Sequence, residues 1–126
     1  MKKISIALVA LFLAGLSGCA PAGVDQSTPE GVANAVFNAA STQNYDMLSG
    51  LCDPDGDHDG DVEEICNLKD ENQDEFVDYF AKGKVSGEAM IEGDEAVVPV
   101  MLGPDGDEEE KMGMIKRDDK WYLYGL

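Results

Sequence analysis

The sequence has few basic side chains for its length. It holds 9 Lys and Arg residues against 26 Asp and Glu residues, which gives a formal net charge of −17. A surface of this sign repels nucleic acid and anionic lipid head groups, because both carry negative phosphates. We therefore expect no nucleic-acid partner. The acidic surface is either a solvated shell that keeps the domain soluble or a surface that attracts cations and basic partners.

Histidine is scarcer still, with His58 as the single example. A histidine-based triad needs a histidine beside a serine in the folded core, and a zinc site needs several nitrogen or sulfur ligands. His58 lies in an acidic stretch with neither set around it. The tyrosines and Trp121 are interpreted as core residues. We therefore expect no catalytic residues and a protein that is not an enzyme.

Long apolar runs are also missing. The longest run, Ile4 to Leu16, is shorter than the roughly 20 residues that span a bilayer. Two lysines, Lys2 and Lys3, precede it. A short apolar run after positive residues is typical of a secretory signal peptide, which we place over residues 1–18.

The run ends in Leu16-Ser17-Gly18-Cys19, which resembles the bacterial lipobox: an aliphatic residue, two small residues and a cysteine. The resemblance implies cleavage before Cys19 and a lipid on its thiol, so that the membrane is a partner through Cys19. Ala20 follows in place of Asp. By resemblance to proteobacterial lipoproteins, this implies a cell-envelope protein on the outer membrane, facing the periplasm. The alternative is an ordinary signal peptide with a chance cysteine.

Cleavage leaves 108 residues, enough for one small domain. Loss of Lys2 and Lys3 takes the formal charge to −19. Residues 19–27 are small and polar, so we interpret them as the lipidated cysteine and a short tether. We assign residues 28–126 to a single domain that contains an acidic loop at 53–61.

Cysteine is rare, with three residues in all. Once Cys19 carries lipid, Cys52 and Cys66 remain. An even pair in an exported protein predicts a disulfide. The alternative is two free buried thiols, which an oxidising compartment disfavours.

The first half of the domain shows helical periodicity. Thr28-Pro29-Glu30 is a helix start, with Thr28 as N-cap, and apolar residues recur at helical spacing to about Thr42. A second, short helix carries Tyr45, Leu48 and Leu51. A third covers Val62 to Lys82, and the polar run from Lys69 to Glu75 is the place where it could break.

The second half alternates with a period of two, which predicts strands. Turn residues such as Glu92-Gly93-Asp94 separate them. The predicted strands are Lys84 to Ile91, Ala96 to Leu102, Lys111 to Lys116 and Trp121 to Gly125. The fold class is therefore α+β, with N-terminal helices packed on a C-terminal four-stranded antiparallel curved sheet.

Three stretches together carry a family resemblance. They are Pro29-Glu30 with Asn44-Tyr45-Asp46, Glu92-Gly93-Asp94-Glu95-Ala96-Val97-Val98, and Lys116-Arg117-Asp118-Asp119-Lys120-Trp121-Tyr122-Leu123. Their order resembles the nuclear-transport-factor-2-like superfamily, especially its small bacterial lipoprotein members. The resemblance implies a cystatin-like roll with a cone-shaped pocket between sheet and helices. Some relatives catalyse reactions in this pocket, and many bind or scaffold.

The sharpest local pattern lies between the two cysteines and matches the first half of an EF-hand calcium loop. Its candidate ligands are Asp55, Asp57, Asp59, Asp61 and Glu63, with Gly60 at the sharp turn. Position 12 should be a bidentate Glu and is Cys66 instead, which implies weak affinity. The alternative is a solvated acidic turn.

Three hypotheses follow for the function. The first is an envelope lipoprotein without catalytic activity, whose domain binds an unknown envelope protein or small ligand and needs no cofactor. The second is a lipoprotein that binds Ca²⁺ through residues 55–63. The third is an enzyme that uses the cone-shaped pocket, and it rests on analogy of fold alone.

Overall fold

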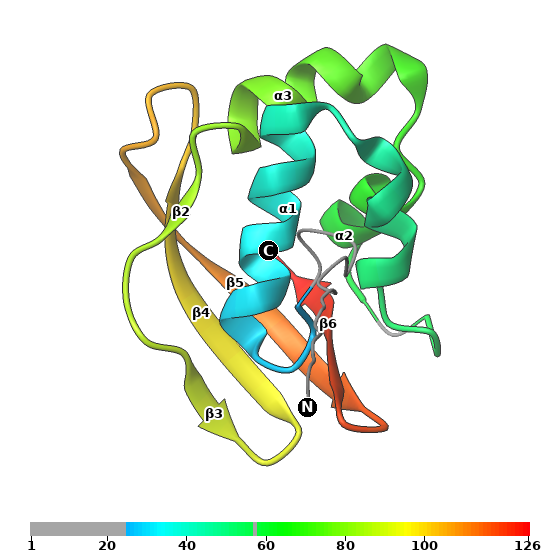
Figure 1. Ribbon diagram of the computed structural model, residues 1–126, viewed down its shortest axis with the longest axis vertical. Coiled ribbons are helices and arrows are strands. Elements are labelled where there is room, and N and C mark those ends of the chain that lie inside the picture. Colours follow the sequence, from blue (N-terminus) through cyan, green and yellow to red (C-terminus); the bar gives the residue numbers. More distant parts are fainter. Residues whose placement is uncertain (1–24, 57) are drawn as a thin grey trace, which may run out of the picture.

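The computed structural model describes residues 25–56 and 58–126. The predicted signal peptide, Cys19 and the candidate calcium ligand Asp57 lie outside the described residues. In the described ranges, no helix combines the length and apolar character needed to cross a membrane. The described chain is α+β, with helices before strands and packed on an antiparallel sheet (Figure 1), so the predicted fold class is confirmed.

Helix α1 (Pro29–Thr42) is the longest helix and lies across one face of the sheet (Figure 1). The Thr28 hydroxyl accepts a hydrogen bond from the Gly31 N–H at 3.0 Å, which satisfies one free donor of the first turn. The helix ends at Gln43, which adopts the left-handed conformation at φ 56°. Its start and end agree with the sequence prediction.

The remaining helical segments are short. They are η2 (Tyr45–Leu51), α2 (Gly60–Cys66), η3 (Asp70–Asn72) and α3 (Gln73–Phe80). The third helix predicted from the sequence is therefore interrupted where the polar run begins. Lys69 has extended backbone, and no residue of η3 is buried. A polar segment without an apolar face gains nothing from packing as a continuous helix.

The sheet has five strands, all antiparallel: β2 (Lys84–Val85), β3 (Met90–Glu92), β4 (Glu95–Leu102), β5 (Glu108–Arg117) and β6 (Lys120–Gly125). Strand β4 is central, as predicted from its apolar residues on both faces. Strands β2 and β3 both pair with β4, but Val85 lies opposite Val100 and Met90 opposite Val97. Residues 86–89 therefore face only two residues of β4, and the one strand predicted here is two.

Pro99 explains the interruption between β2 and β3. It has no N–H to donate to a neighbouring strand. Its carbonyl still accepts a hydrogen bond from the Ser86 N–H at 2.9 Å. The Ala89 N–H, displaced from the ladder, donates instead to the Glu30 carboxylate of α1 at 3.1 Å. The edge of the sheet is thus joined to the first turn of the long helix.

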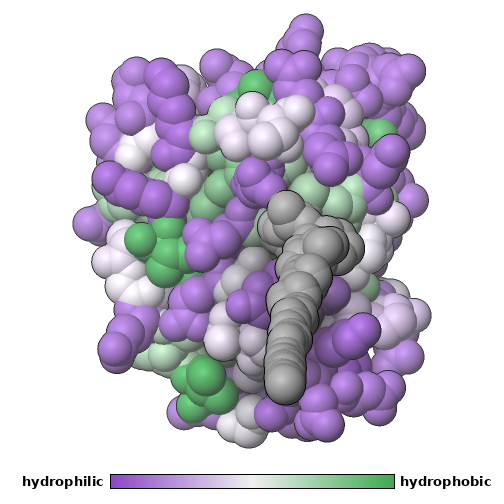
Figure 2. Space-filling view, viewed as in Figure 1, coloured by the Kyte–Doolittle hydropathy of each residue, from purple (hydrophilic) through white to green (hydrophobic). Residues whose placement is uncertain are grey.

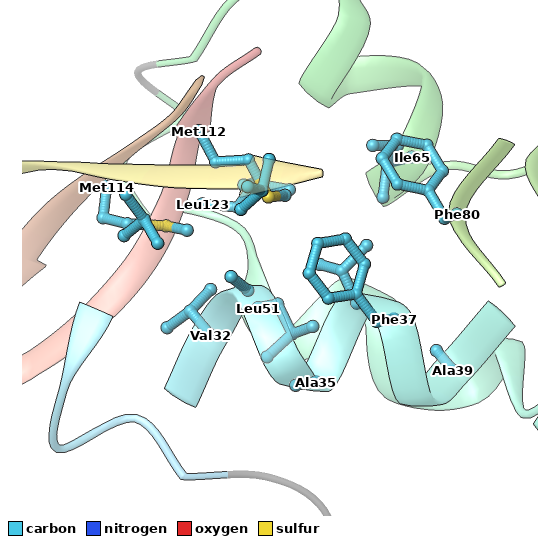
Figure 3. Packing of buried hydrophobic residues seen from close by; sticks show 14 of the residues in the cluster. Val32, Ala35, Phe37, Ala39, Leu51, Ile65, Phe80, Met112, Met114 and Leu123 are labelled. Atoms are coloured by element: carbon cyan, nitrogen blue, oxygen red, sulfur yellow. The ribbon is translucent and has the colours of Figure 1, made fainter. Parts of the chain in front are cut away.

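The core lies between α1 and the sheet. Figure 3 shows Val32 and Phe37 of α1 directed toward Met112, Met114 and Leu123 of the sheet. Alanines occupy much of the buried surface of α1, so the helix can approach the strands closely. Trp121 is also buried, at 4% exposure, as expected for a core residue.

Candidate functional site

Two regions contain the residues that could act on a ligand. One is the acidic loop at 53–61, from which the sequence predicted a calcium site. The other is a pocket between α2, α3 and the start of β5.

Asp53 begins the loop and is the one charged residue that is buried in the described part of the chain. Its carboxylate accepts hydrogen bonds from the Arg117 guanidinium, from Nε at 3.3 Å and from Nη2 at 3.2 Å. Because each carboxylate oxygen meets its own donor, the pair has the parallel two-bond geometry that Arg provides. Arg117 lies at the end of β5, so this pair fastens the loop to the sheet.

Asp55 adds a second carboxylate to the same arginine, with its Oδ2 3.4 Å from the Arg117 Nε. Its backbone N–H donates to the Asp53 Oδ1 at 3.0 Å. Gly56 completes this turn at φ +73°, where a side chain would be strained. The side chain of Asp55 is 68% exposed. The loop therefore folds around Asp53 and Arg117, and Asp55 borders them.

Asp59 acts as the N-cap of α2. Its Oδ1 accepts the Val62 N–H at 2.9 Å, while its Oδ2 accepts the Leu126 N–H at 3.2 Å. Its own N–H donates to the Tyr124 carbonyl at 3.2 Å. Asp59 thus joins the start of α2 to the end of the chain, and both carboxylate oxygens have donors.

Glu63 and His58 lie beside each other at the first turn of α2. The His58 Nε2 is 3.5 Å from the Glu63 Oε1, and the other oxygen of Glu63 accepts from the Asn67 side chain. The His58 side chain is only 9% exposed, although its place in an acidic loop had led us to expect an exposed residue. Its Nδ1 has no hydrogen-bond partner among the described residues.

The predicted calcium ligands are consequently dispersed. Asp55 contacts Arg117, Asp59 caps α2, Glu63 contacts His58, and Asp61 lines the pocket described below. Over residues 25–56 and 58–126, no group of three or more His, Cys, Asp or Glu side chains could hold a metal ion. Asp57 lies outside these residues, so calcium binding by the loop stays a prediction.

Cys52 and Cys66 form a disulfide, with 6.1 Å between their Cα atoms. The bond joins the residue after η2 to the last residue of α2 and encloses the acidic loop. The backbone of Cys52 also forms an isolated parallel β-bridge with Leu123 of β6. The loop is therefore closed at its ends by the disulfide and held along its length by Arg117 and β6.

The second region is a pocket of about 540 Å³. Its floor is apolar and is formed by Ile65, Leu68, Phe76, Phe80 and Leu102. Figure 3 shows Ile65 of α2 and Phe80 of α3 directed toward each other, with Phe37 of α1 nearby. Phe76 and Phe80 have ring centroids 5.1 Å apart. The floor thus continues into the hydrophobic core.

The rim of this pocket is acidic. Five carboxylates line it, with Lys111 as the one basic residue: Asp61, Glu64, Glu75, Asp78 and Glu110. All five residues are exposed. None of the five forms a salt bridge with another described residue. The pocket therefore offers apolar surface below and uncompensated negative charge above.

Tyr79 lies between the floor and the rim of the pocket, and both affect the pKa of its hydroxyl. Partial burial is the main cause that raises the pKa of the Tyr79 hydroxyl above its usual value, followed by the charges of Glu110, Glu108 and Asp61. Burial and negative neighbours both disfavour the phenolate. The negative charge of α2 and of the start of β5 thus converges on one ring of the pocket.

Exposed apolar surface elsewhere is limited. The exposed large hydrophobic residues of the described chain are Tyr79 at 36%, Met90 at 61%, Ile91 at 55% and Leu126 at 38%. Tyr79 and Leu126 line the pocket, while Met90 and Ile91 lie on β3. Figure 2 shows the face toward the viewer as mostly hydrophilic, with small separate hydrophobic spots. The pocket therefore includes two of these four exposed residues, and Met90 lines a second hollow of about 600 Å³ beside β3, β4 and β5.

Sequence reasoning missed most of this region. The predicted third helix covers Glu64, Glu75 and Asp78, but no sequence pattern singled out Glu110 or Arg117. Arg117 is nevertheless the single arginine in a chain with 26 acidic residues. That rarity was the signal that could have identified it as a partner for a buried carboxylate. The pocket residues come from α2, η3, α3, β4 and β5, with Leu68 and Leu126 outside these elements, and no local pattern connects them.

No family model matches the chain, and no curated protein matches it. Among solved structures, it is similar to the solution structure of a SEC-C motif containing protein from Rhodopseudomonas palustris. The TM-score is 0.52 and the sequence identity 16%, over 78% of this chain and 76% of that chain. At this identity the likeness concerns the fold alone, so the function of this chain has to be argued from its own residues.

Proposed function

We propose that this protein is a membrane-anchored envelope lipoprotein whose domain binds a ligand or partner and does not catalyse a reaction. The observation that carries the anchoring is Leu16-Ser17-Gly18-Cys19, which stands a few residues before a folded domain. By resemblance to proteobacterial lipoproteins, we place it on the outer membrane, facing the periplasm. The Cys52–Cys66 disulfide supports an oxidising compartment of this kind.

The start of the domain supports a short tether. The Gln26 carbonyl accepts the Trp121 N–H at 2.9 Å, and its side chain donates to the Trp121 carbonyl at 3.0 Å. Gln26 and Ser27, assigned to the tether from their polar character, therefore belong to the folded part. Seven residues, 19–25, remain as the connection and reach about 25 Å at full extension. The lipid would hold the domain next to the membrane.

Binding is favoured over catalysis by the distribution of carboxylates. An acid–base enzyme typically keeps a carboxyl group in an apolar cavity, where burial adjusts its pKa. In the described chain the buried carboxylate is Asp53, which is held by Arg117 and lies outside the pocket. The carboxylates of the pocket are exposed at its rim. Such a rim suits recognition of a ligand.

The anchoring is tested with Cys19→Ala. We expect wild type to sediment with membranes and to incorporate an alkyne-tagged fatty acid, and the variant to do neither, because it lacks the thiol that accepts lipid. Cys52→Ala/Cys66→Ala is the matched control, since it loses two cysteines and keeps Cys19. A Cys19→Ala protein that stays in the membrane fraction and carries the label would refute the anchoring.

A further inference from the structure

We propose that the pocket between α2, α3 and β5 binds small organic cations that carry an apolar body. The inference rests on the proposed binding function and names the class of ligand. It follows from three features of the pocket: the chemistry of the floor, the charge of the rim, and the size.

The floor selects for an apolar body. The core residues Ile65, Phe76, Phe80 and Leu102 back it, and the apolar surface open to a ligand comes from the half-buried Leu68 and from Tyr79, which is 36% exposed. Water against such a surface is released when a hydrocarbon group takes its place. Aromatic rings also attract cations to their faces. The floor therefore favours an alkyl or aryl group and tolerates a positive charge close to it.

The rim selects for positive charge. Asp61 and Glu64 approach from α2, Glu75 and Asp78 from α3, and Glu110 from β5. Their charges lie around one opening, with Lys111 as the single lysine of the lining. Partial burial is the main cause that raises the pKa of Tyr79, and the charges of Glu110, Glu108 and Asp61 add to it inside the pocket. An ammonium group entering here gains several carboxylate neighbours, and an anionic ligand meets repulsion.

The size selects for a molecule and not for a metal ion. A volume of about 540 Å³ lies within the range of 300–1,000 Å³ of small-molecule pockets in general. The rim carboxylates surround the opening and do not converge, since no metal-competent group occurs in the described chain. A ligand of about a dozen heavy atoms places its apolar part on the floor and its ammonium group at the rim.

The experiment uses the full lipidated protein in nanodiscs of zwitterionic lipid, with empty nanodiscs as blank. Saturation-transfer NMR and calorimetry compare four probes: 4-phenylbutylammonium, neutral 4-phenylbutanol, anionic 4-phenylbutyrate and tetramethylammonium, which lacks an apolar body. We expect saturable binding of 4-phenylbutylammonium, weaker binding of 4-phenylbutanol and of tetramethylammonium, and no binding of 4-phenylbutyrate. Binding should weaken in 0.5 M NaCl, because the rim is exposed to screening.

Variants assign the binding to the pocket. Glu75→Gln/Asp78→Asn should weaken the binding of 4-phenylbutylammonium by about three- to tenfold, as expected for the loss of two exposed ion pairs. Asp118→Asn/Asp119→Asn removes the same charge from the exposed turn between β5 and β6, which lies outside the lining, and should change the affinity by less than about twofold. Tyr79→Ser, at a partly exposed residue, should weaken every probe that carries a phenyl group.

Several results would overturn the inference. They are equal binding of 4-phenylbutyrate, equal losses from the two charge variants, or no saturable binding of any cation. Binding of the neutral or anionic probe in place of the cation leaves a binding domain with another ligand class. Failure of the proposed anchoring has a different signature, since it appears as wild-type protein without lipid label in the soluble fraction.

Discussion

Arg117 is the only arginine in the chain, and it sits beside the only charged side chain that is buried in the described residues. The Asp53 carboxylate is fully buried, while the Arg117 side chain is 32% exposed. A carboxylate removed from water needs hydrogen bonds to its charge. Lysine could give a point charge, but only arginine offers two parallel donors to the two oxygens.

Replacing Arg117 tests this dependence. Arg117→Met retains much of the apolar stem and leaves Asp53 buried without its main donors. We expect a loss of about 3 kcal/mol in the free energy of unfolding, at the lower end for a broken buried pair because Arg117 is partly exposed. Urea unfolding followed by the fluorescence of Trp121, the single tryptophan, measures it.

Two further variants serve as controls for Arg117. Asp55→Asn alters the exposed partner of the same arginine and should cost less than about 1 kcal/mol. Asp53→Asn/Arg117→Met should recover part of the loss, because no charge then remains buried. If Arg117→Met is no more destabilising than Asp55→Asn, the pair does not hold the loop.

At the scale of elements, the disulfide joins two short helical segments, η2 and α2, that also share the hydrophobic core. Cys52 and Cys66 are 14 residues apart, and a loop of about 15 residues closed by a disulfide is worth about 3 kcal/mol. We expect Cys52→Ala/Cys66→Ala to unfold at correspondingly lower urea concentration. The same shift should appear when wild type is reduced. Intact mass after alkylation, with and without reductant, checks the bond, and two thiols free in the unreduced protein would contradict it.

The acidic loop is the element in which sequence pattern and structure diverge most. In an EF-hand the loop carboxylates face one ion. Here Asp53, Asp55 and Asp59 already accept donors from Arg117, Val62 and Leu126. Helix α2 also begins at Gly60, halfway through the matching segment. The protein's own donors occupy sites that an ion would otherwise fill.

The melting temperature at fixed ionic strength separates calcium binding from general screening. Screening of an acidic surface makes Ca²⁺ and Mg²⁺ act alike and leaves Asp55→Ala/Asp57→Ala responding as wild type does. A rise that Ca²⁺ produces and Mg²⁺ does not, lost in the double variant, would instead establish the calcium site. Mg²⁺ serves as the matched ion because it prefers a smaller octahedral shell.

Elements with local signals were predictable from the sequence. Thr28 and Pro29 mark the start of α1, and residues that alternate between the two faces of the sheet mark β4 and β6. The division of the edge strand into β2 and β3 was not predictable, because Pro99 acts on residues 86–89, which precede it by ten to thirteen positions. The pair of Asp53 and Arg117 joins residues 64 positions apart. A single sequence carries no record of such contacts, and the pocket, assembled from α2, α3 and β5, was missed for the same reason.

At the scale of the whole molecule, the first and last parts of the chain are closely interleaved. Helix α1 contacts β4, β5 and β6. The segment that leads into α1 lies beside β6 (Figure 1), where Gln26 contacts Trp121. The core is thus enclosed only when strands from the second half cover the helix from the first. This arrangement is the opposite of a chain whose successive segments fold independently.

The contacts of β6 and Leu126 have a consequence for the export that we propose. Gln26 pairs with Trp121 across 95 residues, and Asp59 with Leu126 across 67. A chain whose last strand is still inside the cell has no partner for either residue. We therefore expect the segment that has already emerged to stay unfolded until the last strand has followed it through the secretion channel. The disulfide bridges only 14 residues, so it can form while translocation is still under way.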